Sequence, residues 1–184
     1  LGSVADRTQV DPLVGEICVG AGECSPNPDN PEGTIRKWDD LDAVSRTDAF
    51  LTWNVAEDSP YIGSGQLDGN GIPPNFFSDA KVRKAFATCF DYDTYIQEVQ
   101  LGEGVRNNGP IISGMLGYNP DGPYYQYNPE ECAAFLEAAW DGALPETGFR
   151  FQIAFNTGNT GRQTIAEIWQ AELGAINELY QIET

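Results

Sequence analysis

The feature that most constrains the fold is a change of hydrophobic period near the C-terminal end of the sequence. Aromatic and aliphatic side chains alternate with other residues over 149–155, and this period of two predicts a strand. Apolar residues 165, 168, 169 and 173 then share one helical face, and residues 179–182 read as a new strand. A strand, a helix and a further strand in this order are typical of α/β domains.

Three further amphipathic helices are predicted before this strand. The first begins at Ser78 and Asp79, with residues 82, 85, 86 and 89 on one apolar face. The second follows Asp91 and buries residues 95, 96 and 99. The third begins at Asn128, where an Asn cap, a Pro at the first helical position and a Glu at the third form a strong start signal.

The other segments complete a prediction of an α/β fold with a mixed sheet flanked by helices. Residues 49–54 are a short apolar run and predict a buried strand, with Trp53 packed in the core. Residues 104–127 form a long connection rich in Gly, Pro and Tyr, whose tyrosines either wrap the domain or stack on a ligand. Residues 1–48 are loop-rich and are expected to form an irregular surface segment that contains Cys18 and Cys24.

The charge of the sequence excludes some classes of function. It carries 28 acidic and 10 basic side chains, a net charge of -18, and this balance argues against binding to nucleic acid or to anionic membranes. It contains no histidine, so catalysis by Ser-His or Cys-His pairs within this chain is excluded. No apolar run reaches the roughly 20 residues of a membrane span. No metal site, cofactor or catalytic residue is predicted.

Four cysteines leave three alternatives open. Cys18 and Cys24 are close in sequence, whereas Cys89 and Cys132 lie on two predicted helices. An even count permits two disulfides and an oxidising compartment. The alternatives are four buried thiols, or a zinc site, although the paired C-x-x-C spacing of many zinc sites is missing.

Three blocks of sequence resemble the family 5 extracellular solute-binding proteins. The first runs from Ser78 through Val82-Arg83 to Asp93, similar to the family pattern D-x-x-V-R-x-A-x-x-x-A-x-D. The second is the Asn-Pro-Glu-Glu helix that begins at Asn128, and the third is the strand 149–155 with its polar loop and following helix. The resemblance covers roughly residues 49–184 and leaves 1–48 unmatched.

This resemblance implies one lobe of a periplasmic-binding-protein-like (type II) receptor with two lobes. Residues 1–184 would be a single α/β lobe, truncated at its C-terminus, with a family-like core over 49–184. The implied function is the extracytoplasmic solute-binding component of an ABC importer. It would bind a peptide or another small solute between the lobes and deliver it to permease subunits. The location would be the periplasm or the outer face of a bacterial or archaeal membrane, with any anchor outside this chain.

The resemblance also assigns residues. The loop after strand 149–155 would face the cleft, so the ligand-binding candidates are Asn156, Thr157, Asn159 and Arg162. The alternative is that this loop only caps the next helix through Thr160. Cys89 and Cys132 stand where the family usually has small residues on buried helix faces, which favours a disulfide between them. In this comparison Arg83 is interpreted as a structural residue that anchors its helix by an ion pair.

Two other functions remain open at the level of sequence. A signalling or adhesion module could use the same fold, because fold alone does not fix function. A carboxylate-dependent hydrolase would suit the many acidic residues, although no spacing defines a catalytic pair. Genes for permease and ATPase subunits beside this one would favour transport.

Overall fold

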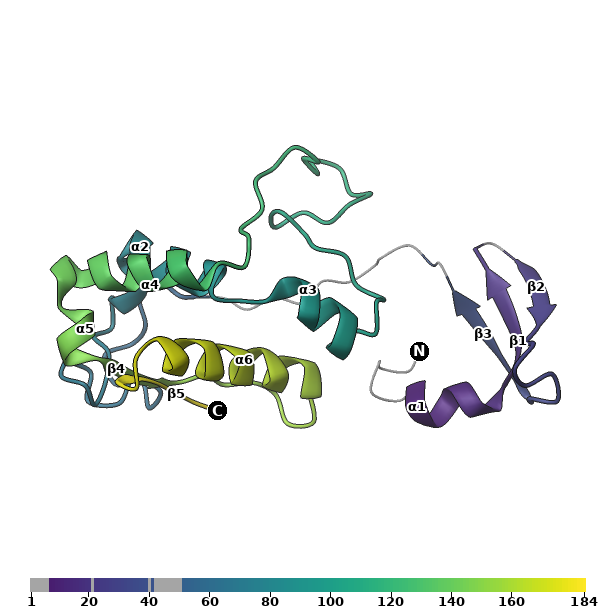
Figure 1. The fold of residues 1–184 in the computed structure, drawn as a ribbon, viewed down its shortest axis with the longest axis horizontal. Coiled ribbons are helices and arrows are strands. Elements are labelled where there is room, and N and C mark those ends of the chain that lie inside the picture. Colours follow the sequence, from purple (N-terminus) through teal and green to yellow (C-terminus); the bar gives the residue numbers. More distant parts are fainter. Residues whose placement is uncertain (1–6, 21, 40, 42–50) are drawn as a thin grey trace. The chain divides into compact units, whose positions relative to one another are not determined.

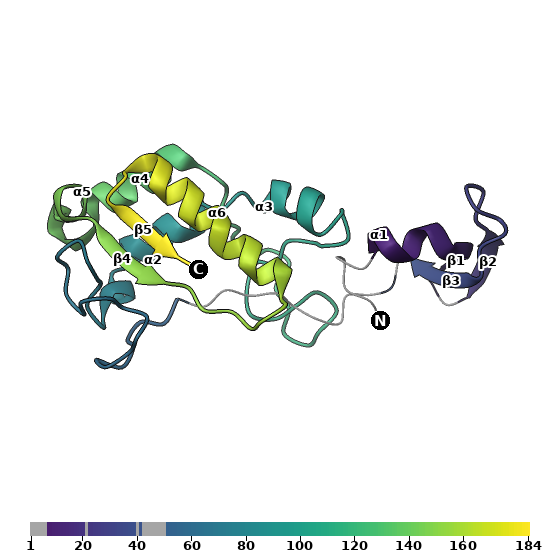
Figure 2. The same ribbon diagram turned by 90° about the horizontal axis from the view of Figure 1, so that it is seen from below.

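The computed structural model describes residues 7–20, 22–39, 41 and 51–184. By backbone proximity the chain divides into two compact units, one made of residues 1–46 and 109–120, the other of residues 47–108 and 121–184. Figures 1 and 2 show their elements. Among the described residues, no helix combines the length and the apolar character needed to cross a membrane.

The first unit contains a small mixed sheet. After two short helical turns, α1 (Arg7–Val10) and η2 (Asp11–Leu13), the strands are β1 (Val14–Val19), β2 (Glu23–Pro26) and β3 (Ile35–Asp39). Strand β1 lies in the centre, antiparallel to β2 and parallel to β3. Gly15 and Gly33 pass so closely that a Cβ on Gly15 would lie 2.0 Å from the Gly33 oxygen, which explains both glycines.

The expectation of an irregular loop was wrong for β1, β2 and β3. The β-branched residues of β1 favour a strand, but the glycines around them favour turns, so the sequence pattern did not indicate a strand. Gly20 adopts the left-handed conformation (φ 57°) in the turn between β1 and β2. Cys18 and Cys24 are opposite one another in this hairpin and form a disulfide. The expected turn chemistry is found in the turn between β1 and β2 and in the connection 27–34.

The second unit is built around two packed helices, α2 (Ala80–Thr88) and α4 (Pro129–Ala138), which lie side by side in Figure 1. Each begins as predicted, because Asp79 accepts a hydrogen bond from the Lys81 amide and Asn128 accepts one from the Glu131 amide. Cys89 and Cys132 are fully buried and form the second disulfide. All four cysteines are therefore paired, and the thiol and zinc alternatives are wrong.

A parallel strand pair and a long helix complete this unit. Strand β4 (Phe149–Gln152) pairs with β5 (Tyr180–Glu183), and α6 (Thr160–Ile176) connects them and packs on β5 (Figure 2). The predicted strand ends at Gln152 rather than Phe155, since the Ile153 amide donates the last bond of this pairing, to Glu183. The α/β class with a mixed sheet and helices is confirmed.

The core of the second unit combines aromatic and aliphatic side chains. The largest side chains that are fully buried there are Phe76, Phe86, Phe149, Leu136, Leu144, Leu173 and Val82. Phe76 contacts Phe149 with ring centroids 5.3 Å apart, and the indole N–H of Trp169 donates to the Phe86 carbonyl at 2.8 Å. This rigid core fixes the end of β4 and the start of α6, where the candidate site lies.

Shorter elements connect these helices and strands. They are η3 (Phe76–Ser78), α3 (Tyr92–Thr94), the π-helical turn η4 (Tyr95–Val99), η5 (Ala139–Gly142) and α5 (Leu144–Thr147). Asp91 caps α3 as predicted, by accepting a hydrogen bond from the Thr94 amide. The long connection 104–127 has no helix or strand, also as predicted.

Candidate ligand-binding site

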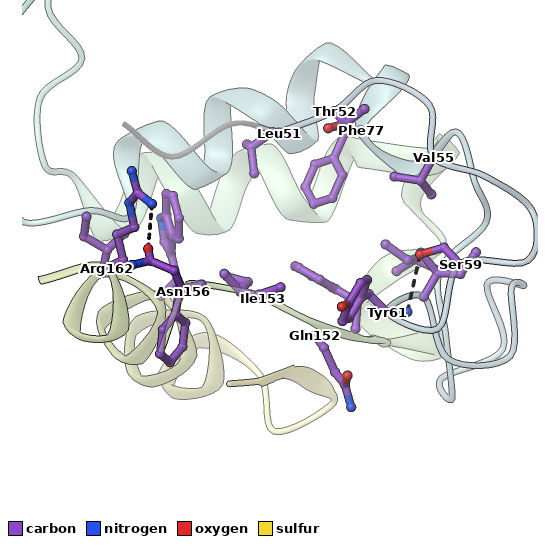
Figure 3. A pocket seen from close by; sticks show the side chains of 17 residues that line it. Leu51, Thr52, Val55, Ser59, Tyr61, Phe77, Gln152, Ile153, Asn156 and Arg162 are labelled. Atoms are coloured by element: carbon purple, nitrogen blue, oxygen red, sulfur yellow. Dashed lines mark hydrogen bonds between the residues drawn. The ribbon is translucent and has the colours of Figure 1, made fainter. Parts of the chain in front are cut away.

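A pocket of about 600 Å³ opens in the second unit, where β4 ends. This volume is in the usual range for small-ligand sites. Its walls come from residues 51–62, from Ile72 and Phe77, from the chain that continues β4 through residue 156, and from the first turns of α6. Figure 3 shows Leu51, Val55 and Phe77 on one side of the space and Ile153 on the other.

Two of the four predicted ligand-binding residues, Asn156 and Arg162, line one end of this pocket. The Asn156 side-chain oxygen accepts hydrogen bonds from the Arg162 guanidinium at 2.7 Å and from the Asn159 amide group at 3.3 Å. The guanidinium has further N–H groups beyond the one used here. Arg162 is therefore held at the pocket and can still receive a carboxylate.

The other two predicted residues do not line the pocket. Asn159 is the N-cap of α6, since its side-chain oxygen accepts from the Arg162 amide at 3.0 Å. The alternative that placed this cap at Thr160 was wrong by one residue. Thr157 is exposed in the turn between β4 and α6.

The main chain of this wall is also available for bonding. None of the hydrogen bonds found within the described residues uses the peptide groups of Ala154 or Phe155, although both residues line the pocket. Main-chain N–H and C=O groups are strong hydrogen-bonding groups, and leaving them unpaired away from water costs free energy. They offer a ligand backbone donors and acceptors, as in the binding modes where a peptide adds to a sheet edge.

Arg162 is the one charged side chain among the described residues that line the pocket. Gln152 also lines it, but its amide group donates to Glu183 at 2.9 Å. That bond, together with Arg150, holds the pKa of Glu183 below its usual value. At the end opposite Arg162, Ser59 and Tyr61 supply neutral hydroxyl groups (Figure 3). The lining thus combines apolar walls, one cation and a few neutral polar groups.

Trp53 does not have its predicted role in the core, whereas Arg83 anchors its helix as predicted but through other partners than expected. Residues 51–54 form no strand, and residues 49 and 50 lie outside the described part of the chain. Trp53 is 61% exposed, and the Arg83 guanidinium lies 4.4 Å from the centre of its ring. Arg83 anchors the start of α2 by donating to the carbonyls of Phe77 and Ser78 rather than by an ion pair.

The tyrosines at the end of the long connection bind the protein itself. Tyr124 lies on one side of Arg106, with its ring centre 5.3 Å from the guanidinium carbon, and Tyr127 donates to Glu172 at 2.8 Å. This hydrogen bond is the main cause that raises the pKa of Tyr127 to about 12, and burial adds to it. Neither tyrosine lines the pocket, so within this unit they support the wrapping interpretation.

Sequence reasoning missed the wall formed by Val55, Ser59 and Tyr61. These residues lie in a stretch rich in Gly, Pro, Asp and Asn, which predicts turns but gives no indication of a pocket. Their contribution depends on the fold, because they face residues about 100 positions later in the chain.

Comparison with known proteins identifies relatives of this chain. Residues 34–183 match the family described as bacterial extracellular solute-binding proteins, family 5 middle. The chain is 31% identical over 135 residues to the di/tripeptide-binding protein 2 of Pseudomonas aeruginosa, covering 73% of this chain and 24% of that protein. It is 33% identical over 155 residues to the oligopeptide-binding protein AppA of Bacillus subtilis, covering 78% and 26%.

A third relative is the dipeptide-binding protein of Escherichia coli, 29% identical over 133 residues, with 72% of this chain and 24% of that protein covered. The chain therefore spans about a quarter of the length of these relatives. All three are binding proteins by name.

Proposed function

The chain belongs to family 5 of the bacterial extracellular solute-binding proteins, and from this premise we propose that its gene product is the extracytoplasmic peptide-binding component of an ABC importer. The ligand is a short peptide, in keeping with the peptides named for the three relatives. Two disulfides support a location outside the cytoplasm, where thiols are not kept reduced.

The observation that carries this proposal is the end of the pocket where Arg162 lies beside the unbonded main chain of Ala154 and Phe155. A peptide presents a repeating row of N–H and C=O groups and ends in a carboxylate. Ala154 and Phe155 offer complementary main-chain groups, and Arg162 offers the cation. We therefore propose that the peptide backbone binds to Ala154 and Phe155 and that the peptide carboxylate binds to Arg162.

In this proposal the pocket is one wall of a cleft between two lobes. A ligand that contacts both lobes stabilises the closed form relative to the open form, because it makes its full set of contacts only there. The permease then distinguishes loaded from empty receptor by that closure. No covalent bond is made or broken, and the protein releases the peptide unchanged.

A carboxylate test addresses the proposed site directly. The full-length gene product is titrated calorimetrically with Ala-Leu-Ala and with the same peptide carrying a C-terminal amide. Hydrogen bonds to charged groups contribute about 1.5–3 kcal/mol. We therefore expect the free carboxylate to bind about 10- to 100-fold more tightly than the amide.

The variant Arg162→Gln should remove this preference, whereas Arg150→Gln should keep it. Arg150 is the control, because this arginine lies nearby on β4 but does not line the pocket, whereas Arg162 lies on α6 and does. A preference that survives in Arg162→Gln contradicts the role given to Arg162. A gene product that binds neither peptide contradicts the proposed function.

A further inference from the structure

The middle of the pocket, between its two polar ends, is apolar on both sides. Leu51, Val55 and Phe77 form one side and Ile153 lies across from them (Figure 3). Leu51, Val55 and Ile153 are half-buried, so part of each side chain remains accessible, whereas Phe77 is only 7% exposed. An apolar surface of this kind loses contact with water when an apolar group fills it.

We propose that this wall selects an apolar side chain on the bound peptide, and this inference rests on the proposed function. Within the described lining, no carboxylate stands ready to receive an ammonium group, and Arg162 lies at the end rather than in the middle. A leucine side chain gains free energy when it fills the space. A lysine ammonium or a glutamate carboxylate would lose water there without gaining a partner.

The surface charge of the protein does not change this selectivity. The net charge of -18 attracts cationic ligands at long range and affects the rate at which they arrive. Selectivity at equilibrium depends instead on the groups that contact the side chain. The acidic side chains lie outside the described lining, so the inference favours apolar over cationic peptides despite the acidic surface.

Val55 is the residue through which this selectivity can be changed. Its amide donates to the Pro74 carbonyl at 2.9 Å, which holds its backbone in place whatever the side chain. Its side chain is half-buried and lines the pocket. Val55→Glu would place a carboxylate in the wall, and Val55→Gln would place a neutral group of similar size there.

The test measures the affinity of the full-length gene product for Ala-Leu-Ala, Ala-Lys-Ala and Ala-Ala-Ala by calorimetry. We expect the leucine peptide to bind about 10- to 100-fold more tightly than the other two, which is the ratio expected when one apolar side chain is buried. Val55→Glu should lower the affinity for the leucine peptide and raise the affinity for the lysine peptide. Val55→Gln should lower the affinity for the leucine peptide and leave the affinity for the lysine peptide unchanged.

The outcomes separate this inference from the function on which it rests. Equal affinity of the leucine and lysine peptides in the natural protein would overturn the inference and leave peptide binding intact. An unchanged affinity for the lysine peptide in Val55→Glu would also overturn it. A misfolded Val55→Glu variant would lose affinity for all three peptides, so it could not produce the expected increase in affinity for the lysine peptide. Failure of all three peptides to bind would overturn the proposed function itself.

Discussion

The disulfide between Cys89 and Cys132 should be the main covalent support of the second unit. It joins the C-terminal end of α2 to the first turns of α4, and both cysteines are fully buried. The perturbation is the double substitution Cys89→Ala and Cys132→Ala. Alanine is small and apolar, so it suits a buried helix position and mainly removes the link.

The expected magnitude follows from the lengths of chain that the two disulfides close. Cys89 and Cys132 are 43 positions apart, and the chain-entropy relation gives about 4 kcal/mol of stabilisation for a loop of this length. Cys18 and Cys24 are 6 positions apart, for which the same relation gives about 2.2 kcal/mol. Loss of these stabilisation energies would raise the equilibrium constant for opening about a thousandfold around Cys89–Cys132 and about fortyfold around Cys18–Cys24.

Hydrogen exchange of the full-length gene product, read by mass spectrometry, reports both regions separately. The double substitution should accelerate exchange in α2 and α4 about a thousandfold wherever exchange requires the two helices to separate. Reduction of the natural protein should do the same. Replacing Cys18 and Cys24 should accelerate exchange only in β1 and β2, by about fortyfold.

Exchange in α2 and α4 that accelerates less than about tenfold would refute this reasoning. So would an equal effect of the two disulfides in their own regions, because the entropic argument depends on loop length.

Three smaller predictions concern residues around the pocket and the helices. Trp53→Ala should lower the free energy of unfolding by only about 0.5–1 kcal/mol, because it removes an exposed stack on Arg83; a loss above about 2 kcal/mol in urea unfolding would indicate a core role. The hydrogen bond from Tyr127 to Glu172 raises the tyrosine pKa from 10.0 to about 12 in the folded state, so its contribution to stability is present below pH 10 and is lost as the pH rises towards 12; since the pKa values of Tyr92 and Tyr180 are also raised, Tyr127→Phe should reduce the late phenolate absorbance by one tyrosine, and an unchanged late absorbance would contradict the assignment. Asn159→Ala should cost about 1 kcal/mol at the start of α6, seen as roughly fivefold faster exchange in its first turn, and unchanged exchange there would mean that the cap contributes nothing.

Local signals in the sequence were sufficient for the two central helices of the second unit, α2 and α4. Asp79 and Asn128 cap α2 and α4, and the apolar spacing between them selects the buried faces. Such features depend on residues within about one helical turn of each other. The same is true of the alternation that identified β4.

Features that depend on distant residues were not predicted correctly. Strand β1 depends on its pairing with β2 and β3, and the local glycines suggested a loop instead. Trp53 was assigned to the core because it ends a short apolar run, but in the structure its side chain is exposed and stacks against the Arg83 guanidinium. Strand β4 was predicted three residues too long, because alternation does not show where a partner strand stops.

Two of the four ligand-binding residues proposed from the sequence line the pocket of the structure. Asn156 and Arg162 come from the loop after β4 and the first turn of α6, and whether they bind a ligand stays a prediction. The facing wall around Val55 was not predicted, since its residues belong to a stretch with no periodic pattern. A pocket assembled from segments far apart in sequence becomes visible only when the packing is known.

Native mass spectrometry tests the central claim most directly. The full-length gene product is purified without denaturant or reductant and is then sprayed under conditions that keep complexes intact. The account predicts a protein that carries one additional mass, which dissociates as a short peptide, or that acquires such a mass when peptides are added. A protein that stays bare after challenge with mixtures of peptides, sugars and nickel chelates would contradict it.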